Sequence, residues 1–289
     1  MILKEILPEY YSYRAKQTFS APYGLDDPVH SRRGADDWHA YPLKDFVYSF
    51  NSWAFRGKDY AQYKGKPVNI CLGDSFTLNV GGPIEHSWPS QLSENFDIPT
   101  LNFGIDGAGN DIIKLLYAYL IDYFDVQATF VMYSFFHRRY DNSSKSLVHT
   151  GCLDDRENFS YFENNKLTNV YYTFLPHWCW SSSEMDYISS KYKSHRFSHN
   201  THNLNFLNNN RSLFISAERY NNFKGQDWPT YKEFINNSML EDWTYREIFV
   251  TQFNNLFRCV NRDGFHLDYA GNKMVCNYFL SQANCTPGD

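Results

Sequence analysis

The feature that most restricts the fold of this chain is a short apolar run that ends abruptly at Gly73-Asp74-Ser75. Residues 68–72 favour β-structure and follow Pro67, so they predict a buried strand that stops at a tight turn. In an open parallel sheet, ligands bind beyond the carboxyl ends of the strands. The Ser75 hydroxyl would then stand where a substrate binds. Ser75 is therefore a candidate nucleophile, provided that a base and donors for an oxyanion lie near it.

The segments that surround this strand alternate between helix and strand patterns. In chain order they are a helix from about Ser87 with Pro89 in its first turn, a strand over 99–103, an amphipathic helix capped by Asn110 or Asp111, a strand over 128–134, a strand near 212–216, and a helix that includes 274–279. Strands that alternate with helices predict a parallel sheet with helices on both faces. We therefore predict an α/β fold, a three-layer α/β/α sandwich with a flavodoxin-like parallel sheet of about five strands.

A second group of polar residues lies near the C-terminus, just before the last helical pattern. Asp263 and His266 are three positions apart in this segment. A turn there could present the His266 imidazole to Ser75 while Asp263 accepts a hydrogen bond from the other ring nitrogen. The alternative is that Asp263 caps the last helix and His266 is a surface histidine. These residues alone leave both interpretations open.

Together these segments resemble the SGNH (GDSL) hydrolase family. Three stretches match the first, second and fifth blocks of the family in the right order, and residues 51–57 are similar to a segment that precedes the nucleophile block in some members. The three stretches are Gly73-Asp74-Ser75, Leu101-Asn102-Phe103-Gly104-Ile105-Asp106-Gly107 and Asp263-x-x-His266.

The resemblance implies a role for each of these residues. Ser75 would be the nucleophile, His266 the general base and Asp263 the residue that orients the base. The backbone N–H groups of Ser75 and Gly107 would form part of the oxyanion hole. The implied reaction is the hydrolysis of an acyl ester through an acyl-enzyme.

The third family block departs from the pattern. Where the family usually has Gly-x-Asn-Asp, this chain continues with Phe-Phe-His137-Arg138-Arg139. His137 stands in place of the asparagine that donates to the oxyanion, so Asn110 or Asn142 could supply that donor instead. His137 or Arg138 could also donate to an oxyanion or bind an acidic group of the substrate, or this stretch could be a solvated loop. One missing donor costs about 3–4 kcal/mol of transition-state stabilisation, so the departure bears on rate and substrate more than on the reaction class.

Composition and charge argue against several classes of partner. The chain has a net charge of −5 and no basic run, so neither a nucleic-acid-binding nor an anionic-membrane surface is indicated. No apolar run is long enough to span a membrane and no signal peptide is visible, so we expect a soluble, cytoplasmic protein. The six cysteines show no zinc spacing, and we expect reduced thiols, no metal and no cofactor. The spacing of His195, His199 and His202 keeps a metal-dependent hydrolase as a remote alternative.

The pattern also predicts how the chain is divided. We expect residues 1–66 to be an N-terminal extension packed on the core, because they have too few aliphatic residues for a core of their own. Residues 67–289 would form the hydrolase domain, with an aromatic-rich insertion at about 141–207 over the active site. We expect Arg56 to have a structural role.

The substrate is inferred only from composition. Aromatic residues make up 19% of the chain, and their flat apolar faces suit a carbohydrate. We therefore expect an acyl-ester substrate with a short acyl group such as acetyl, carried by a glycan or a small molecule. The alternatives are an O-acyltransferase that uses the same triad, and a catalytically silent glycan-binding or virion-associated protein. The abundance of aromatic residues and asparagine hints at a phage, viral or low-GC bacterial source.

Overall fold

The computed structural model describes residues 9–20, 46–134, 138–141, 143–144, 146–149, 161–162, 169–174, 266–267 and 269–283. The chain divides into two units, one formed by Met1–Leu175 with Cys259–Asp289 and the other by Pro176–Arg258. Every described residue belongs to the first unit. Several predictions fall outside the described residues, namely those for the strand near 212–216, Asp263, His137, Asn142 and the three histidines at 195, 199 and 202.

A parallel sheet lies at the centre of the described unit, with the strand order β4-β3-β5-β8. Its strands are β3 (Pro67–Gly73), β4 (Thr100–Gly104), β5 (Asp125–Tyr133) and β8 (Asn169–Phe174). β3 pairs with β4 on one side and with β5 on the other, and it is buried from its second residue to its last. A strand that is covered on both faces has no need of alternating polar residues, which explains its continuous apolar sequence.

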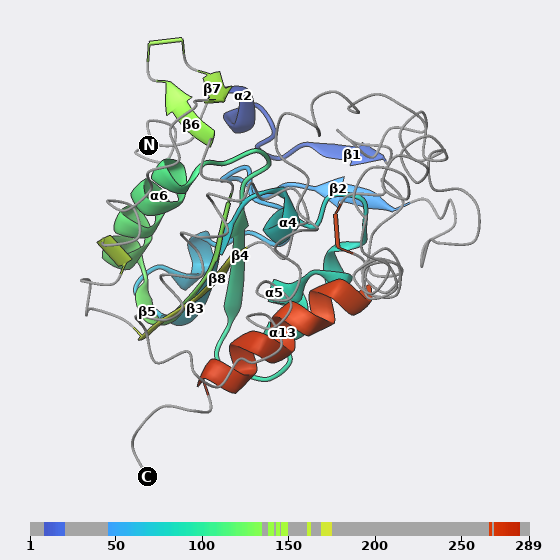
Figure 1. Ribbon diagram of the computed structural model, residues 1–289, viewed down its shortest axis with the longest axis vertical. Coiled ribbons are helices and arrows are strands. Elements are labelled where there is room, and N and C mark those ends of the chain that lie inside the picture. Colours follow the sequence, from blue (N-terminus) through green and yellow to red (C-terminus); the bar gives the residue numbers. More distant parts are fainter. Residues whose placement is uncertain are drawn as a thin grey trace, which may run out of the picture. The chain divides into compact units, whose positions relative to one another are not determined.

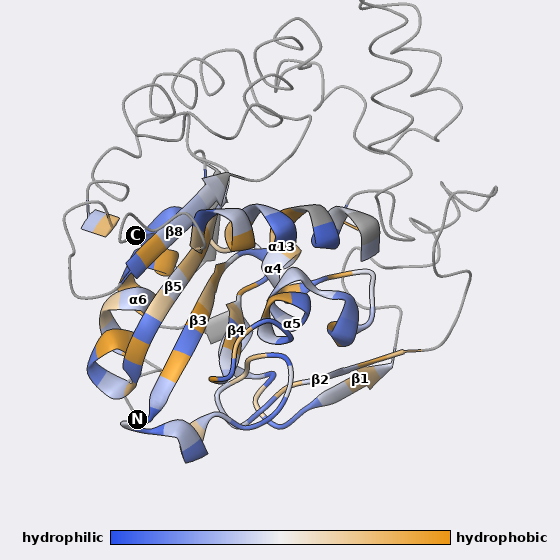
Figure 2. Cartoon of the chain, turned by 90° about the horizontal axis from the view of Figure 1, so that it is seen from below, coloured by the Kyte–Doolittle hydropathy of each residue, from blue (hydrophilic) through white to orange (hydrophobic). Residues whose placement is uncertain are grey.

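Helices cover both faces of this sheet, so the predicted three-layer α/β/α fold is confirmed (Figure 1). α6 (Asn110–Tyr123) lies on one face, and α5 (Trp88–Ser93) and α13 (Tyr269–Ala283) lie on the other. Side chains on opposite faces of β5 contact different helices. The centroid of the Phe130 ring lies 5.4 Å from that of the Phe279 ring in α13. On the other face, the ring of Tyr133 lies 5.7 Å from that of Phe162, and the ring of Phe162 lies 5.0 Å from that of Tyr117 in α6, centroid to centroid. Figure 2 shows hydrophobic residues along β3 and β5 between these helices.

α5 begins where the sequence predicts it to begin. Ser87 is the N-cap, and its hydroxyl oxygen accepts a hydrogen bond from the Ser90 N–H at 3.2 Å. Pro89 occupies the first turn, where its missing N–H is not needed. The local capping signal was sufficient here because both parts of the cap lie within four residues.

α6 begins differently from the prediction. Its N-cap is Gly109, and neither Asn110 nor Asp111 caps the helix. A Cβ atom at Gly109 would lie 2.5 Å from the Arg138 carbonyl oxygen, so the backbone at Arg138 passes too close for a larger residue. The Asn110 side chain instead forms hydrogen bonds with the backbone of Ser134, the residue that follows β5.

The described part of the predicted N-terminal extension contacts the core. It comprises α2 (Glu9–Ser12) and an antiparallel pair formed by β1 (Thr18–Ser20) and β2 (Val47–Ser49). The Tyr11 hydroxyl donates a hydrogen bond to the Gly104 carbonyl oxygen at 2.9 Å. The Arg14 guanidinium lies 3.4 Å from the Asp106 carboxylate. These two contacts join the extension to the carboxyl end of β4 and to the turn that follows it.

The segment that we predicted as an insertion contains part of the central sheet. β8 lies within residues 141–207 and pairs with β5 in parallel, so the prediction of an insertion is wrong for residues 169–174. Aromatic and β-branched residues dominate this strand, including Tyr171 and Tyr172, and β-structure accommodates aromatic residues as readily as a binding platform does. Upstream of it, β6 (Arg138–Asp141) and β7 (Ser146–His149) pair as an antiparallel hairpin near the carboxyl end of β5 (Figure 1).

Two expectations from composition concern cysteines and membranes. Cys71 and Cys276 are free thiols within the protein, and burial raises the pKa of both above the ordinary value. Low thiolate content makes such groups poor nucleophiles. None of the helices that the structure describes combines the length and the apolar character needed to cross a membrane.

Candidate active site

Ser75 lies at the carboxyl end of β3, as the sequence predicts. It is the first residue of a one-turn helix, α4 (Ser75–Leu78), and it is 4% exposed. Asp74 is the N-cap of this helix, and its carboxylate accepts a hydrogen bond from the Phe76 N–H at 3.1 Å. A single turn therefore carries the serine from the strand into the helix and leaves it at the edge of the sheet where ligands bind.

Two glycines allow α4 to lie directly against the strand ends. A Cβ atom at Gly73 would collide with the Thr77 side chain, and one at Gly104 would collide with the backbone of Thr77 and Leu78. Backbone atoms cannot move aside as the end of a flexible side chain can. Glycine at position 104 is thus a requirement of the packing between α4 and β4.

Gly104→Ala is expected to lower the free energy of unfolding by about 1–3 kcal/mol, the usual cost of inserting a methyl group where there is no space. The added Cβ would lie 2.7 Å from the Thr77 carbonyl carbon, so α4 must shift. Urea unfolding followed by tryptophan fluorescence measures the change. An unchanged unfolding midpoint would contradict the close packing of α4 on β4.

Asp74 forms a charged network beneath the Ser75 turn. Its carboxylate is fully buried, and it accepts a hydrogen bond from the Ser134 hydroxyl at 2.8 Å and one from the Arg138 guanidinium at 2.9 Å. Burial raises the pKa of Asp74, and the Arg138 charge acts in the opposite direction. The network joins the turn after β3 to the end of β5 and the start of β6. For Arg138, the interpretation as part of a solvated loop is therefore wrong.

The Asn110 side chain forms two hydrogen bonds with the backbone of Ser134 beside the candidate site. Its amide nitrogen donates to the Ser134 carbonyl oxygen at 3.0 Å, and its amide oxygen accepts from the Ser134 N–H at 2.8 Å. Asn110 is fully buried. This reciprocal pair of bonds holds the residue after β5 in place. A contact of Asn110 with a substrate or an oxyanion stays a prediction.

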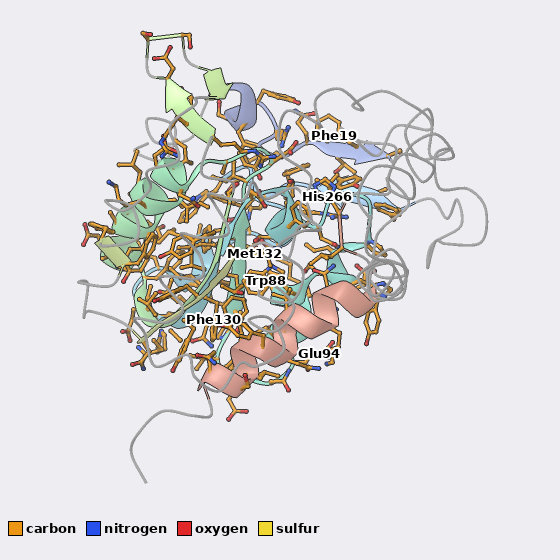
Figure 3. The ribbon with its side chains drawn as sticks, in the orientation of Figure 1. Phe19, Trp88, Glu94, Phe130, Met132 and His266 are labelled. Carbon is orange, nitrogen blue, oxygen red and sulfur yellow. The ribbon has the colours of Figure 1, made fainter. Side chains whose placement is uncertain are left out.

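His266 lies beside the Ser75 turn, just before α13. Its ring is 4.6 Å from the Phe76 ring, centroid to centroid, and it is 1% exposed, so the interpretation as a surface histidine is wrong. An electrostatic interaction with His266 also lowers the pKa of Asp74. Figure 3 shows His266 next to α4. The structure thus brings the predicted base against Phe76, the residue that follows the predicted nucleophile.

Gly107 lies in the turn between β4 and α6. Its φ of +74° is in the left-handed region, which glycine adopts without the strain that a side chain would cause. At the same edge, the Ile105 N–H donates to the Gly73 carbonyl oxygen at 3.0 Å. The turn that carries the predicted oxyanion donor therefore begins against the turn that carries Ser75.

Arg56 has the structural role that we predicted. Its guanidinium is buried and donates to the carbonyl oxygens of Leu78, Asn79 and Gly82 at 3.2, 2.6 and 2.9 Å. It also lies 4.1 Å from the centre of the Tyr48 ring. One side chain thus donates hydrogen bonds to carbonyl oxygens at the end of α4 and in the loop after it. These carbonyl groups have no further helical turn whose N–H groups could donate to them.

Sequence reasoning missed Ser134 and gave no role to Asp74. A signal for both was present, because Asp74 follows one predicted strand, Ser134 ends another, and parallel strands bring their carboxyl ends to one edge. Among the residues that the structure describes, no group of His, Cys, Asp and Glu side chains has the arrangement of a metal site.

The sequence of this chain matches no protein-family model and no curated protein, and its structure resembles a known one only distantly. Among solved structures, the chain is similar to a member of the lipolytic protein G-D-S-L family from Veillonella parvula DSM 2008, at 11% sequence identity and a TM-score of 0.32. The alignment covers 76% of this chain and 100% of the other. A likeness at this level supports no assignment of function or of residue roles.

Proposed function

We propose that the protein is a serine-dependent hydrolase of acyl esters, with Ser75 as the nucleophile and His266 as the general base. The observation that carries the proposal is the buried position of the His266 ring, 4.6 Å from the ring of Phe76. Ser75 precedes Phe76 directly and stands at the carboxyl end of β3. A serine and an imidazole brought to one turn from distant parts of the chain are what the nucleophile and base of a catalytic triad require, and this supports the proposal.

The proposed reaction assigns a role to each of these residues. His266 accepts the proton of the Ser75 hydroxyl while the hydroxyl oxygen attacks the ester carbonyl. The N–H groups of Ser75 and Gly107 hold the oxyanion of the tetrahedral intermediate, and protonated His266 then gives its proton to the departing alcohol. Water, deprotonated by the same histidine, releases the acid from the acyl-enzyme. Asp263 is the proposed partner that orients the imidazole.

The finer part of the proposal concerns the substrate. We propose a short acyl group, such as acetyl, on a glycan or another small alcohol. The support is the aromatic content of the chain, since aromatic faces pack against sugar rings, and the lack of a strongly aliphatic segment that would hold a long acyl chain.

The test compares wild type with Ser75→Ala on para-nitrophenyl acetate, butyrate and a longer ester. We expect turnover that falls with acyl length and drops by about 10⁴-fold or more in the variant, as happens when a triad nucleophile is removed. Ser281→Ala is the control, because this serine of α13 bonds only to the nearby Tyr278 carbonyl oxygen in the described contacts. Equal turnover by wild type and Ser75→Ala would overturn the assignment.

A second arm of the experiment separates hydrolysis from acyl transfer. Acetylated donor is supplied with and without an added glycan, and free acetate and acetylated glycan are both measured. Release of acetate in both reactions supports the hydrolase. Transfer to the glycan at the expense of acetate would replace it with an O-acyltransferase that uses the same residues.

A further inference from the structure

Asn272 connects the two parts of the candidate site. It lies in the first part of α13 and is fully buried. Its amide nitrogen donates to the Leu267 carbonyl oxygen at 2.9 Å and to the Asn79 side-chain oxygen at 3.0 Å. Its amide oxygen accepts from the Trp88 N–H at 2.8 Å. One amide group therefore joins three segments that are far apart in the sequence.

Each segment bears on the position of a predicted catalytic residue. Leu267 directly follows His266, so the bond to its carbonyl oxygen holds the peptide next to the imidazole. Asn79 ends α4, and its own N–H donates to the Ser75 carbonyl oxygen. Asn272 is thus one hydrogen bond away from the residue after the base and two away from the nucleophile.

Asn79 and Trp88, to which Asn272 is bonded, are each held in place by further contacts. Asn79 has a left-handed backbone with a φ of 63°, and its amide nitrogen donates to the Pro83 carbonyl oxygen at 2.7 Å. Trp88, which Figure 3 labels, begins α5. The centroid of its ring lies 4.9 Å from that of the Phe279 ring in α13. A displacement of Asn272 would therefore move α13 and the His266 turn relative to the Ser75 turn.

We propose that Asn272 is a positioning residue that sets the placement of His266 relative to Ser75. This inference deepens the proposed hydrolase function and rests on it for its catalytic consequence. A base that is misplaced by about 1 Å can cost on the order of 100-fold in rate, although the base itself is unchanged.

The chemistry of the side chain explains why an amide stands here. The position needs two donors for Leu267 and Asn79 and one acceptor for Trp88, and asparagine supplies all three. Aspartate would keep the acceptor, lose both donors and place a buried carboxylate against two oxygens. Alanine would leave the Trp88 N–H and the Leu267 carbonyl without this partner.

The experiment compares Asn272→Ala and Asn272→Asp with Asn51→Ala in the full chain. Asn51 is a matched control because it is also buried and makes three side-chain bonds, to the N–H groups of Trp53 and Phe55 and to the Lys58 carbonyl oxygen. Kinetics on para-nitrophenyl acetate give kcat and KM. In parallel, histidine is labelled with ¹⁵N, and the His266 imidazole signals are identified by their loss in His266→Gln.

We expect both Asn272 variants to lower kcat by about 10- to 100-fold with KM changed less than about threefold. We also expect the His266 imidazole signals to shift in both variants and to stay in place in Asn51→Ala, which should lose stability but keep kcat. If Asn51→Ala lowers kcat as much as Asn272→Ala, or if the His266 signals do not move, the positioning role is overturned.

The two readouts separate this inference from the function on which it rests. If wild type hydrolyses no ester, the proposed function fails, and the imidazole signals alone decide whether Asn272 places His266. If wild type is active but the signals and kcat are indifferent to Asn272, the function stands and the inference fails.

Discussion

His266→Ala is expected to lower kcat on para-nitrophenyl acetate by about 10⁴-fold or more, with the protein still folded. Removal of the base from a triad costs nearly as much as removal of the nucleophile, because the two act as one unit. The His266 ring is buried against Phe76, the residue that follows Ser75. Release of para-nitrophenol, measured over hours, covers this range of rates.

The control for this substitution is His86→Ala. The His86 ring also lies near the start of α13, 5.0 Å from the Tyr269 ring, but it is partly exposed and its ring contact is with α13. We expect His86→Ala to keep kcat within about threefold of wild type. Equal losses in the two variants would mean that His266 acts through packing and not as the base.

Arg138→Met is expected to lower the free energy of unfolding by about 3 kcal/mol at neutral pH. The substitution removes the cation that lies 2.9 Å from the fully buried Asp74 carboxylate, and an uncompensated buried charge is costly. Methionine retains much of the volume of the arginine stem, so the loss reports on charge more than on packing. Urea unfolding at pH 7.5 measures it.

The loss in Arg138→Met should depend on pH with a definite sign. Burial raises the pKa of Asp74, and removal of Arg138 takes away an influence that lowers it, so the pKa in the folded variant rises further. A carboxyl whose folded pKa is raised contributes stability below its unfolded pKa and loses it as the pH rises through the folded pKa. We therefore expect the deficit against wild type to shrink between pH 7.5 and pH 4.5. A deficit of the same size at both pH values would contradict the charge account.

A double variant tests the same account by another route. Asp74→Asn combined with Arg138→Met removes both charges, and it should recover part of the stability that Arg138→Met loses. The oxygen of the replacement amide can still accept from the Phe76 N–H, and its NH2 group, in the place of the other carboxylate oxygen, can donate to the Ser134 hydroxyl oxygen; the corresponding contacts of Asp74 are 3.1 and 2.8 Å long. A double variant less stable than Arg138→Met would show that the carboxylate is needed for more than its pairing.

The parts of the fold that were predictable are those specified by residues close together in the sequence. β3 has a continuous apolar run that ends at a turn, and α5 has both members of its cap within four residues. The predicted N-cap of α6 was wrong by one or two residues, because position 109 has room only for glycine beside the backbone of Arg138, which lies far along the chain. β8 was missed because its tyrosines fit a binding surface as well as a strand.

The candidate site was predictable in its residue types and not in its supporting contacts. Ser75 and His266 were named by the resemblance of their segments to a family pattern, because the local residues alone left the role of His266 open. Nothing near Asp74 in sequence points to Arg138, and nothing near Asn272 points to Asn79, because these pairs form only when the sheet and α13 are assembled. Tertiary packing determines which polar side chains pair, and the local sequence does not specify these pairs.

The bond between Asn272 and Asn79 has a consequence for the order of events during protein synthesis. The ribosome makes β3 and the Ser75 turn long before α13, and the early part of a chain folds while the later part is still being made. Contacts between segments so far apart form late, because a long loop must close before they can exist. Until α13 has docked, the emerging chain would thus carry Ser75 without His266 beside it, and the bonds of Asn272 to Asn79 and Trp88 would still be unmade.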